Sequence, residues 1–555
     1  MISIFLVNIF LLINIIGYTY LYKYLFSNSS NFQLKNIELL YGFFFITFLS
    51  IILNFFLPLK ITFYFCLLIG LYFGLRTIIK KNITFSLLHY FLIVMCFSII
   101  TSNNGENIDL PMYHMQIINW IANNKIPFGI TDLEIRYGMN SSWHNFISLF
   151  NFSISTAKSS SFFTITLLSF FIIEALNSEK KLTISHFFLS LTASFIFFYT
   201  IIHPLTNGII LNHLGNPEVD IPVMIFFLVS FYIFLKIVFE RKFFLINLLS
   251  ISCLLTFTTK ISYFAVLLLP IVAILIIKEK FFFNLKLIKN KNEIFVFFIF
   301  LISWSFKGYI NSGCILFPVT FSCFDVGWGA EISEIDHYSK IIMGFARDTR
   351  LRARYTDFEY IINTYNWIVP WFKDYFLNTS LLKISASITF LYFCFFTIYK
   401  LVKKENFLFL NKLNIYIFLF FALCLFIWFK APEVRFGWGI FISIPCFLIA
   451  LKYDLLNKFK IFNIKLNLNF FLVILIFLLT IKNINYFNMV NFYEINKKYD
   501  YSNIKEYKKF NNHFIYQSRN WKCYDFELIC VNSIKEVYLI NKVFGHYIFK
   551  KRDEK

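Results

Sequence analysis

Long apolar runs recur along the whole chain and constrain its fold more than any other feature. About fourteen runs long enough to cross a bilayer begin near residues 2, 37, 61, 84, 159, 184, 219, 244, 261, 293, 379, 412, 437 and 468. A spanning helix needs about 20 mainly apolar residues, and 58% of this chain is hydrophobic while 15% is charged. We therefore predict an all-α polytopic integral membrane protein with about 14 transmembrane helices. The first run lacks a cationic flank and a cleavage site, which favours a retained span over a signal peptide.

The basic residues of the short connections predict the orientation of the spans. They fall in alternate connections, at Arg76, Lys80 and Lys81; Lys180 and Lys181; Arg241 and Lys242; Lys278, Lys280, Lys286, Lys289 and Lys291; and Lys400, Lys403 and Lys404. The positive-inside rule makes these connections cytoplasmic and turns both termini outward. The net charge of +21 then reflects topology and contact with anionic membrane lipids, so no nucleic-acid partner is expected.

Three polar segments interrupt this pattern and divide the chain. We expect N-terminal spans over 1–101, a first large periplasmic loop over 102–158, central spans over 159–308, a second large loop over 309–378, C-terminal spans over 379–483 and a periplasmic polar tail over 484–555. The tail is too short and polar for a large core, so it should be a small cap held by a disulfide.

The first outer loop carries the leading candidate for a catalytic group. Asp109 follows an apolar run and precedes Pro111, and the next residues place Tyr113, Ile117, Trp120 and Ile121 on one helical face. Such a pattern indicates a helix lying in the membrane interface. A carboxylate there could take a proton from an acceptor while the donor stays in lipid. Alternatively, Asp109 caps that helix.

A second carboxylate opens another apolar run on the same predicted side. Asp220 follows Glu218 in Pro217-Glu-Val-Asp220, and ionisable residues at the membrane edge are costly and tend to be functional. Asp109 and Asp220 could divide base and positioning roles, or hold one divalent cation such as Mg²⁺ or Mn²⁺ between them. For Asp220, too, helix capping is the alternative.

Cations on the same side could engage a phosphate. The candidates are Lys260, Arg136 in the first loop, and Arg435, which follows Glu433 in a short outward turn. A lipid-phosphate donor needs cations that hold the phosphate and stabilise it as a leaving group. The alternatives are a snorkelling side chain for Lys260 and a structural ion pair of Arg435 with Glu433 or another loop acid.

Loop histidines and a basic run complete the polar inventory. His114 and His144 could share protons or bind a metal ion. The run Arg347, Arg350, Arg352 and Arg354 fits a solvated helix face better than a binding site.

Four cysteines fall in the predicted outward segments. Cys314 and Cys323 lie in the second loop, and Cys523 and Cys530 lie in the tail. Two close pairs on an oxidising side predict two local disulfides, because short loops cost the least closure entropy. Zinc sites are disfavoured since no histidine has ligand spacing to either pair.

With these residues in place, the chain resembles known membrane proteins. The acid in the first outer loop, with a helix after it, resembles the GT-C class of membrane glycosyltransferases. More closely, the chain resembles a family of bacterial polytopic proteins associated with surface-polysaccharide genes. The shared segments are Tyr113-His-Met-Gln116 with Trp120, Arg136-Tyr-Gly-Met-Asn-Ser-Ser-Trp143, Pro217-Glu-Val-Asp220, Ser312-Gly-Cys-Ile-Leu-Phe-Pro318 with Ser322-Cys-Phe324, Pro432-Glu-Val-Arg-Phe436 and the tail cysteines.

The resemblance implies a GT-C-like architecture and a transferase of the bacterial inner membrane. Such an enzyme moves a sugar from a polyprenyl-phosphate-linked donor to a glycan or lipid acceptor on the periplasmic side. Asp109 would be the base or metal ligand, supported by Asp220, with His114, Arg136, Lys260, Glu433 and Arg435 at the substrate. Two departures stand out: the first-loop acid lacks the adjacent second acid of many GT-C enzymes, and the polar tail is small.

Two alternatives remain open from the sequence. One is an O-antigen-type polysaccharide polymerase that joins lipid-linked repeat units, and the other is a flippase or exporter without chemistry. An exporter should carry charged or broken helices through the membrane midplane. The candidate charges instead gather at one face, which favours an enzyme.

Overall fold

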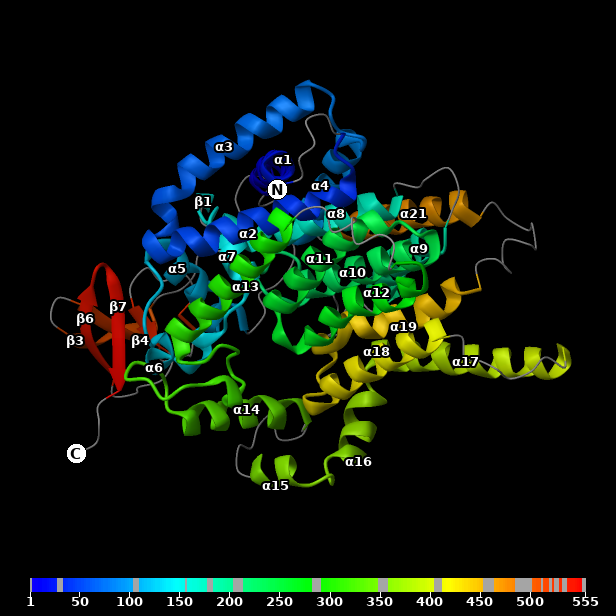
Figure 1. Cartoon of the computed structure of the whole chain (residues 1–555). Coiled ribbons are helices and arrows are strands. Elements are labelled where there is room, and N and C mark those ends of the chain that lie inside the picture. The colour runs from blue at the N-terminus through cyan, green and yellow to red at the C-terminus, as the bar shows by residue number, and fades with distance from the viewer. Residues whose placement is uncertain are drawn as a thin grey trace.

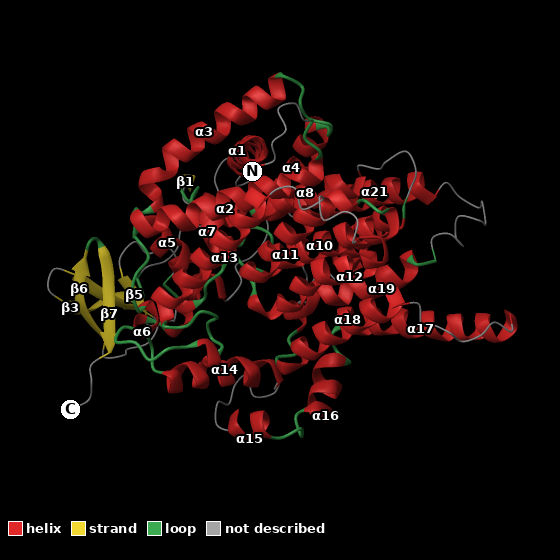
Figure 2. Cartoon of the chain, in the orientation of Figure 1, coloured by secondary structure: helices red, strands yellow, loops and turns green. Residues whose placement is uncertain are grey.

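The structure is a computed structural model, and it is mostly helical with a small group of strands at the C-terminal end (Figures 1 and 2). It describes residues 2–26, 33–102, 109–154, 157–176, 183–202, 213–281, 291–347, 358–403, 412–452, 464–484, 502–510, 513–518, 522–523, 529–531 and 537–551.

Each of the fourteen predicted apolar runs forms a helix. They are α1 (Ile2–Phe26), α2 (Leu39–Phe56), α3 (Leu59–Ile79), α4 (Leu87–Ser102), α8 (Thr164–Leu176), α9 (Ile184–Ile202), α10 (Asp220–Glu240), α11 (Ile246–Thr259), α12 (Leu268–Phe281), α13 (Lys291–Ser312), α17 (Ser380–Lys403), α18 (Lys412–Lys430), α19 (Trp438–Ala450) and α21 (Ile464–Ile484). A helix bonds all its inner backbone groups within one segment, which is what an apolar surrounding requires.

Fewer of these helices meet the full criteria for a membrane span. Among the described residues, seven are long and apolar enough, or up to eight if the bent pair Ile368–Phe376 and Ser380–Phe395 is one span. Six others contain apolar helical stretches of only 10–17 residues. At 1.5 Å per residue they reach roughly 15–26 Å, short of a hydrocarbon core of about 30 Å. The chain is thus compatible with a multi-pass membrane protein, and the number fourteen stays a prediction.

The helices differ in how deeply they are buried by their neighbours. In α8 and α10, 94% of the apolar window lies inside the protein, against 22% in α3. α10 packs against α9, α11 and α19 at the centre, while α3 packs along α1 at the edge (Figure 1). The two helix backbones are so close there that a Cβ added to Gly17 would lie only 2.0 Å from the carbonyl oxygen of Gly70. Small residues let helix backbones approach in this way.

The first large loop is folded into short elements. They are the π-helical turn η2 (Leu110–His114), α5 (Met115–Asn123), α6 (Ile130–Leu133), the 3-10 turn η3 (Ile135–Gly138), α7 (Ser142–Ser148), the strand pair β1 (Ser153–Ile154) and β2 (Ala157–Lys158), and the 3-10 turn η4 (Ser159–Phe162).

The predicted interfacial helix is present, but protein covers it on all sides. It is α5, and all residues from Met115 to Ala122 are buried, the polar Gln116 and Asn119 included. Its neighbours include α3, α7 and the tail, whose Tyr547 and Phe549 rings contact Trp120 edge-on. The polar face is therefore covered by protein and not open to water. The pattern of polar and apolar residues in one helix does not indicate which other segments will cover that helix.

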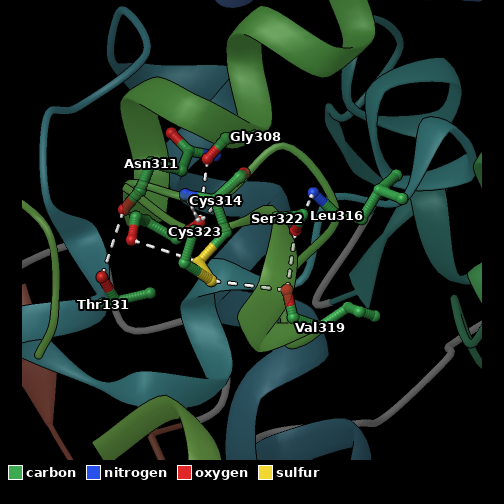
Figure 3. Close-up of a disulfide and its surroundings, with 9 residues drawn as sticks. Thr131, Gly308, Asn311, Cys314, Leu316, Val319, Ser322 and Cys323 are labelled. Atoms are coloured by element: carbon green, nitrogen blue, oxygen red, sulfur yellow. Dashed lines mark hydrogen bonds between the residues drawn. A yellow bond between two sulfur atoms is a disulfide. The ribbon is translucent and has the colours of Figure 1, made fainter. Parts of the chain in front are cut away.

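The second large loop continues from α13 into a disulfide-closed turn. Cys314 and Cys323 are bonded as predicted, and the 3-10 turn η9 (Thr320–Ser322) lies between them. Figure 3 shows Thr131 of α6 donating to the carbonyl oxygen of Asn311 beside this disulfide. The loop then forms α14 (Ile332–Arg347), α15 (Phe358–Asn363), α16 (Ile368–Trp371) and the π-helical turn η11 (Phe372–Phe376). The first and second loops are thus packed together.

The tail contains strands, so the predicted all-α class is wrong for this segment. β3 (Ile504–Phe510) pairs antiparallel with β4 (His513–Ser518), β4 pairs parallel with β5 (Ile529–Val531), and β6 (Val537–Val543) pairs antiparallel with β7 (His546–Lys551). Valine, isoleucine, tyrosine and phenylalanine favour strands. Phe544 and Gly545 both have positive φ, as a two-residue hairpin turn requires. The predicted Cys523–Cys530 disulfide is present, and both cysteines are buried.

The tail is docked onto the first loop through main-chain hydrogen bonds. The Phe128 N–H donates to the Tyr547 carbonyl at 2.8 Å, and the Phe549 N–H donates to the Phe128 carbonyl at 3.0 Å. The Tyr137 hydroxyl donates to the Cys530 carbonyl at 2.9 Å. The tail and the first loop therefore lie on the same side of any membrane that the helices cross (Figure 2).

This docking makes a prediction about labelling from outside the cell. Single cysteines placed at Asn123 in α5 and at Phe544, which is 90% exposed, should both react with a membrane-impermeant maleimide in intact spheroplasts. The wild-type protein is the control, because four of its six free cysteines are buried and the others are half-buried. Reaction of both cysteines only after lysis would invert the predicted topology. Reaction of one but not the other would contradict the docking.

Candidate functional site

Asp109 lies immediately before η2 and forms an ion pair. Its backbone is helical and its side chain makes no capping hydrogen bond, so the capping alternative does not describe its role. Instead its Oδ2 accepts from Nη1 of Arg435 at 2.6 Å, and each side chain is 22% exposed. Arg435 lies in η12 (Val434–Gly437), the 3-10 turn between α18 and α19.

Asp220 and Lys260 form a second and more buried pair. Lys260 Nζ donates to Asp220 Oδ1 at 2.5 Å, with side-chain exposures of 15% and 7% respectively. Asp220 is the first residue of α10, and Lys260 separates α11 from the 3-10 segment η7 (Ile261–Leu267). The ammonium group therefore points to a carboxylate and does not snorkel to water.

One aromatic ring joins the two pairs. Lys260 Nζ lies 3.9 Å from the centre of the Phe436 ring, and the guanidinium carbon of Arg435 lies 5.6 Å from it. Cations are attracted to the face of such a ring. We call Asp109, Asp220, Lys260 and Arg435 the charge cluster; it contains two acids and two cations from four separate segments.

Titratable groups surround the charge cluster. His213 Nδ1 and Glu218 Oε2 lie 2.8 Å apart, and His114 Nδ1 lies 3.0 Å from His144 Nε2. Burial lowers the pKa of His114, although Glu218 and Asp109 partly oppose this effect. Burial lowers the pKa of His144 further, and His114 and Lys307 add to that shift. Both imidazoles are therefore neutral near pH 7.

The histidine pair predicts a loss of stability in acid. The pKa of each buried ring lies below its ordinary value of 6.5, so the unfolded chain takes up protons first. The two neutral histidines contribute fully to the free energy of unfolding above pH 6.5. This contribution is lost as the pH falls below 6.5, at up to about 1.4 kcal/mol per pH unit for each histidine. His144→Gln should reduce the slope of melting temperature against pH between pH 6.5 and 5. His89→Gln, at an exposed position, is the control, and an unchanged slope in His144→Gln would contradict the assignment.

The other predicted substrate residues lie beside the charge cluster with different partners. Arg136 Nε donates to Glu134 at 2.9 Å, and its guanidinium lies 5.9 Å from the Tyr113 ring centre. Glu433 accepts from the Tyr375 hydroxyl at 2.9 Å. The ion-pair partner of Arg435 is therefore Asp109, an acid of the first loop, and not Glu433.

Of the basic run after α14, the structure describes only Arg347. Its guanidinium donates to the carbonyl oxygens of Lys430 and Ile362. Arg350, Arg352 and Arg354 lie outside the described residues.

The polar residues near the cluster include many buried atoms without partners. Among the described residues, the buried side-chain atoms that lack a hydrogen bond include Ser141 Oγ, Trp143 Nε1, His144 Nδ1, Asn145 Nδ2, both amide atoms of Asn216, Glu218 Oε1 and Trp438 Nε1. Buried polar groups are normally satisfied, so these atoms are candidates for binding water or a ligand.

Ionisable residues also lie within the candidate spans, in addition to the candidate charges that meet in the charge cluster. Glu174 of α8 accepts from the Tyr232 hydroxyl of α10 and lies 3.9 Å from Lys236 Nζ. Lys307 lies within α13. The sequence signal for Glu174, Lys236 and Lys307 is a charged residue inside an apolar run, and none of the three is among the predicted site residues.

The donor set fits a divalent cation poorly. Each carboxylate of the charge cluster already has a cationic partner. In the part of the chain that the structure describes, no group of three His, Cys, Asp or Glu side chains is gathered as metal ligands. No chemical step below is therefore assigned to a metal ion.

Comparison with known proteins places the chain in a family. Residues 1–442 match the family described as Domain of unknown function (DUF8201), and the chain belongs to that family. The match contains the whole charge cluster and ends before the tail strands. No curated protein and no solved structure matches the chain.

Proposed function

We propose that this protein is a GT-C-like glycosyltransferase of the bacterial inner membrane. It moves a sugar from a polyprenyl-phosphate-linked donor to a glycan or lipid acceptor on the periplasmic side. The observation that carries the proposal is the charge cluster, in which two carboxylates and two cations meet at the start of α10 and beside the first loop. A sugar transfer from a phosphate needs both kinds of group, a base for the acceptor and cations for the leaving group.

The pairing of Asp109 with Arg435 supports a specific order of events. A guanidinium binds a phosphate in a bidentate manner, and such contacts are stronger than those to a neutral group. The incoming donor phosphate exchanges with Asp109 on Arg435 and releases the carboxylate. Asp109 then becomes available as a base where the donor is held.

The transfer step follows from this exchange. The acceptor hydroxyl gives its proton to Asp109 as its oxygen forms a bond to the anomeric carbon. The bond between that carbon and the phosphate oxygen breaks, and the carrier phosphate leaves with the electron pair. Arg435 and Lys260 stabilise the charge on the leaving phosphate, while Asp220 holds Lys260 in place.

A deletion strain tests this proposal. Loss of the gene should remove one sugar from a cell-surface glycan or lipid, and the sugar-linked polyprenyl phosphate should accumulate on the periplasmic side. Complementation with the wild-type gene should restore both. An unchanged glycan profile together with unchanged donor levels would contradict the proposal.

A flippase without chemistry is a second candidate, and one observation favours it. Glu174, Lys236 and the Tyr232 hydroxyl form a buried polar group within the spans, and His186 Nε2 lies 3.0 Å from that hydroxyl. Ionisable groups inside spans can form substrate or proton paths. A flippase predicts that Glu174→Gln blocks export while Asp109→Asn does not, and that the lipid-linked donor accumulates on the cytoplasmic side.

A further inference from the structure

Lys307 is a buried basic residue whose hydrogen-bond partner is neutral. The residue is 2% exposed and lies in α13, and its Nζ donates to Asn145 Oδ1 at 2.5 Å. Four other buried or partly buried cations have acidic partners: Lys260 with Asp220, Arg435 with Asp109, Arg136 with Glu134 and Lys236 with Glu174. Within the described residues, no carboxylate forms an ion pair with Lys307.

Two further polar atoms on α7, the helix that carries the Lys307 partner Asn145, lack partners. Asn145 Nδ2 and His144 Nδ1 are buried and have no hydrogen bond among the described residues. Both residues are fully buried in α7, and the Lys307 charge also acts on the His144 ring. Leaving such a group unsatisfied is destabilising, and leaving a buried charge unpaired is more so.

The histidine pair supplies a second donor on the same helix. A neutral His144 ring carries one proton, on Nδ1 or on Nε2. When His114 donates from Nδ1, His144 Nε2 is the acceptor, and the His144 proton is on Nδ1. The unpartnered atom is then an N–H donor, as is Asn145 Nδ2.

We infer that Lys307, Asn145 and His144 form an anion-binding site for the phosphate or carboxylate of a membrane-bound substrate. Together they offer an amine that becomes cationic beside an anion and two N–H donors, and an oxyanion satisfies all three. A metal cation would be repelled by the ammonium group, and a neutral sugar would leave its charge unpaired. The site lies next to His114 and so beside the charge cluster. The inference rests on the charges and donors and does not require the transfer reaction.

Asn145→Asp gives a sharp test because it supplies the missing counterion within the protein. The aspartate keeps the size of the side chain and forms an ion pair with Lys307. In nanodiscs of zwitterionic lipid, the variant should melt at a higher temperature than the wild type when no anion is added. Inorganic phosphate or a short-chain prenyl phosphate, at about a hundredfold excess over its Kd, should raise the melting temperature of the wild type by roughly 2 °C. Neither probe should raise that of Asn145→Asp.

Two further variants complete the experiment. Asn151→Asp makes the same change at a half-buried position whose amide contacts Asn119 and Ser160, so its response to both probes should match the wild type. Lys307→Met removes the charge and keeps much of the side-chain volume, and it also removes the desolvation cost of a buried charge without a counterion. Its response to both probes should be lost even if Asn145→Asp does not fold.

The outcomes separate the sources of the anion. If both probes raise the melting temperature of the wild type, and neither raises that of Asn145→Asp or Lys307→Met, the site binds the phosphate group itself. If only the prenyl phosphate raises the melting temperature of the wild type, and neither variant responds to it, the site binds a lipid-linked phosphate. No response in the wild type, or an equal response in the wild type and Lys307→Met, would overturn the inference and leave Lys307 as a structural hydrogen-bond donor.

Discussion

Asp109→Asn is expected to lower sugar transfer by roughly 10²–10⁴-fold, the usual effect of losing a catalytic base. The amide cannot accept the proton of the acceptor hydroxyl. It also removes the anionic partner of Arg435, which is 2.6 Å away in the wild type. Because both side chains are partly exposed, the variant should still fold. Transfer is measured in membranes of the complemented deletion strain, with the amount of protein determined for each variant.

A matched control and a double variant separate catalysis from ion pairing. Asp336→Asn changes an exposed aspartate of α14 that pairs with Lys340, and its transfer activity should be normal. If Asp109 served only to neutralise Arg435, removing both charges in Asp109→Asn/Arg435→Gln would restore activity. The catalytic role predicts that the double variant stays inactive. Full activity in the single Asp109→Asn variant would exclude Asp109 as the base.

Asp220→Asn is expected to have the largest effect on stability. It leaves the Lys260 ammonium without its carboxylate at a position that is 15% exposed, and breaking a buried pair costs about 3–5 kcal/mol. The double variant Asp220→Asn/Lys260→Met should recover most of this free energy, because replacing both partners is often neutral. Unfolding in detergent, followed by circular dichroism, measures the difference.

The recovery of stability should not bring recovery of activity. Lys260 would no longer be present to stabilise the leaving phosphate, so the stable double variant should remain impaired in transfer. The exposed pair of Asp336 and Lys340 is the comparison, since such pairs contribute about 0–1 kcal/mol. A loss in Asp220→Asn no larger than in Asp336→Asn would show that the buried pair has no special role.

The sequence predicted the local features of this protein well. The apolar runs became helices because each run is mainly apolar over at least ten residues, and the two disulfides formed between cysteines that are close in the chain. Asp109 and Asp220 were singled out by their places at the ends of apolar runs. These are properties of single segments.

What the sequence could not predict are the partners of these residues. Asp109 and Arg435 are 326 residues apart, and Lys307 and Asn145 are 162 residues apart. Neither segment alone indicates which other segment it will meet. For the same reason the burial of α5 was not foreseen, since the strand that covers Trp120 lies near the C-terminal end of the chain.

The docking of the tail has a consequence for biosynthesis. Phe128 is made early, but the strand that bonds to it ends at Lys551. Likewise Asp109 must wait for Arg435, and at 5–20 residues per second the 326 intervening residues take roughly 15–65 s to synthesise. During that interval Asp109 has no Arg435 to pair with, and the backbone of Phe128 has no strand to bond to. The charge cluster and the docked tail are therefore complete only when nearly the whole chain has been made.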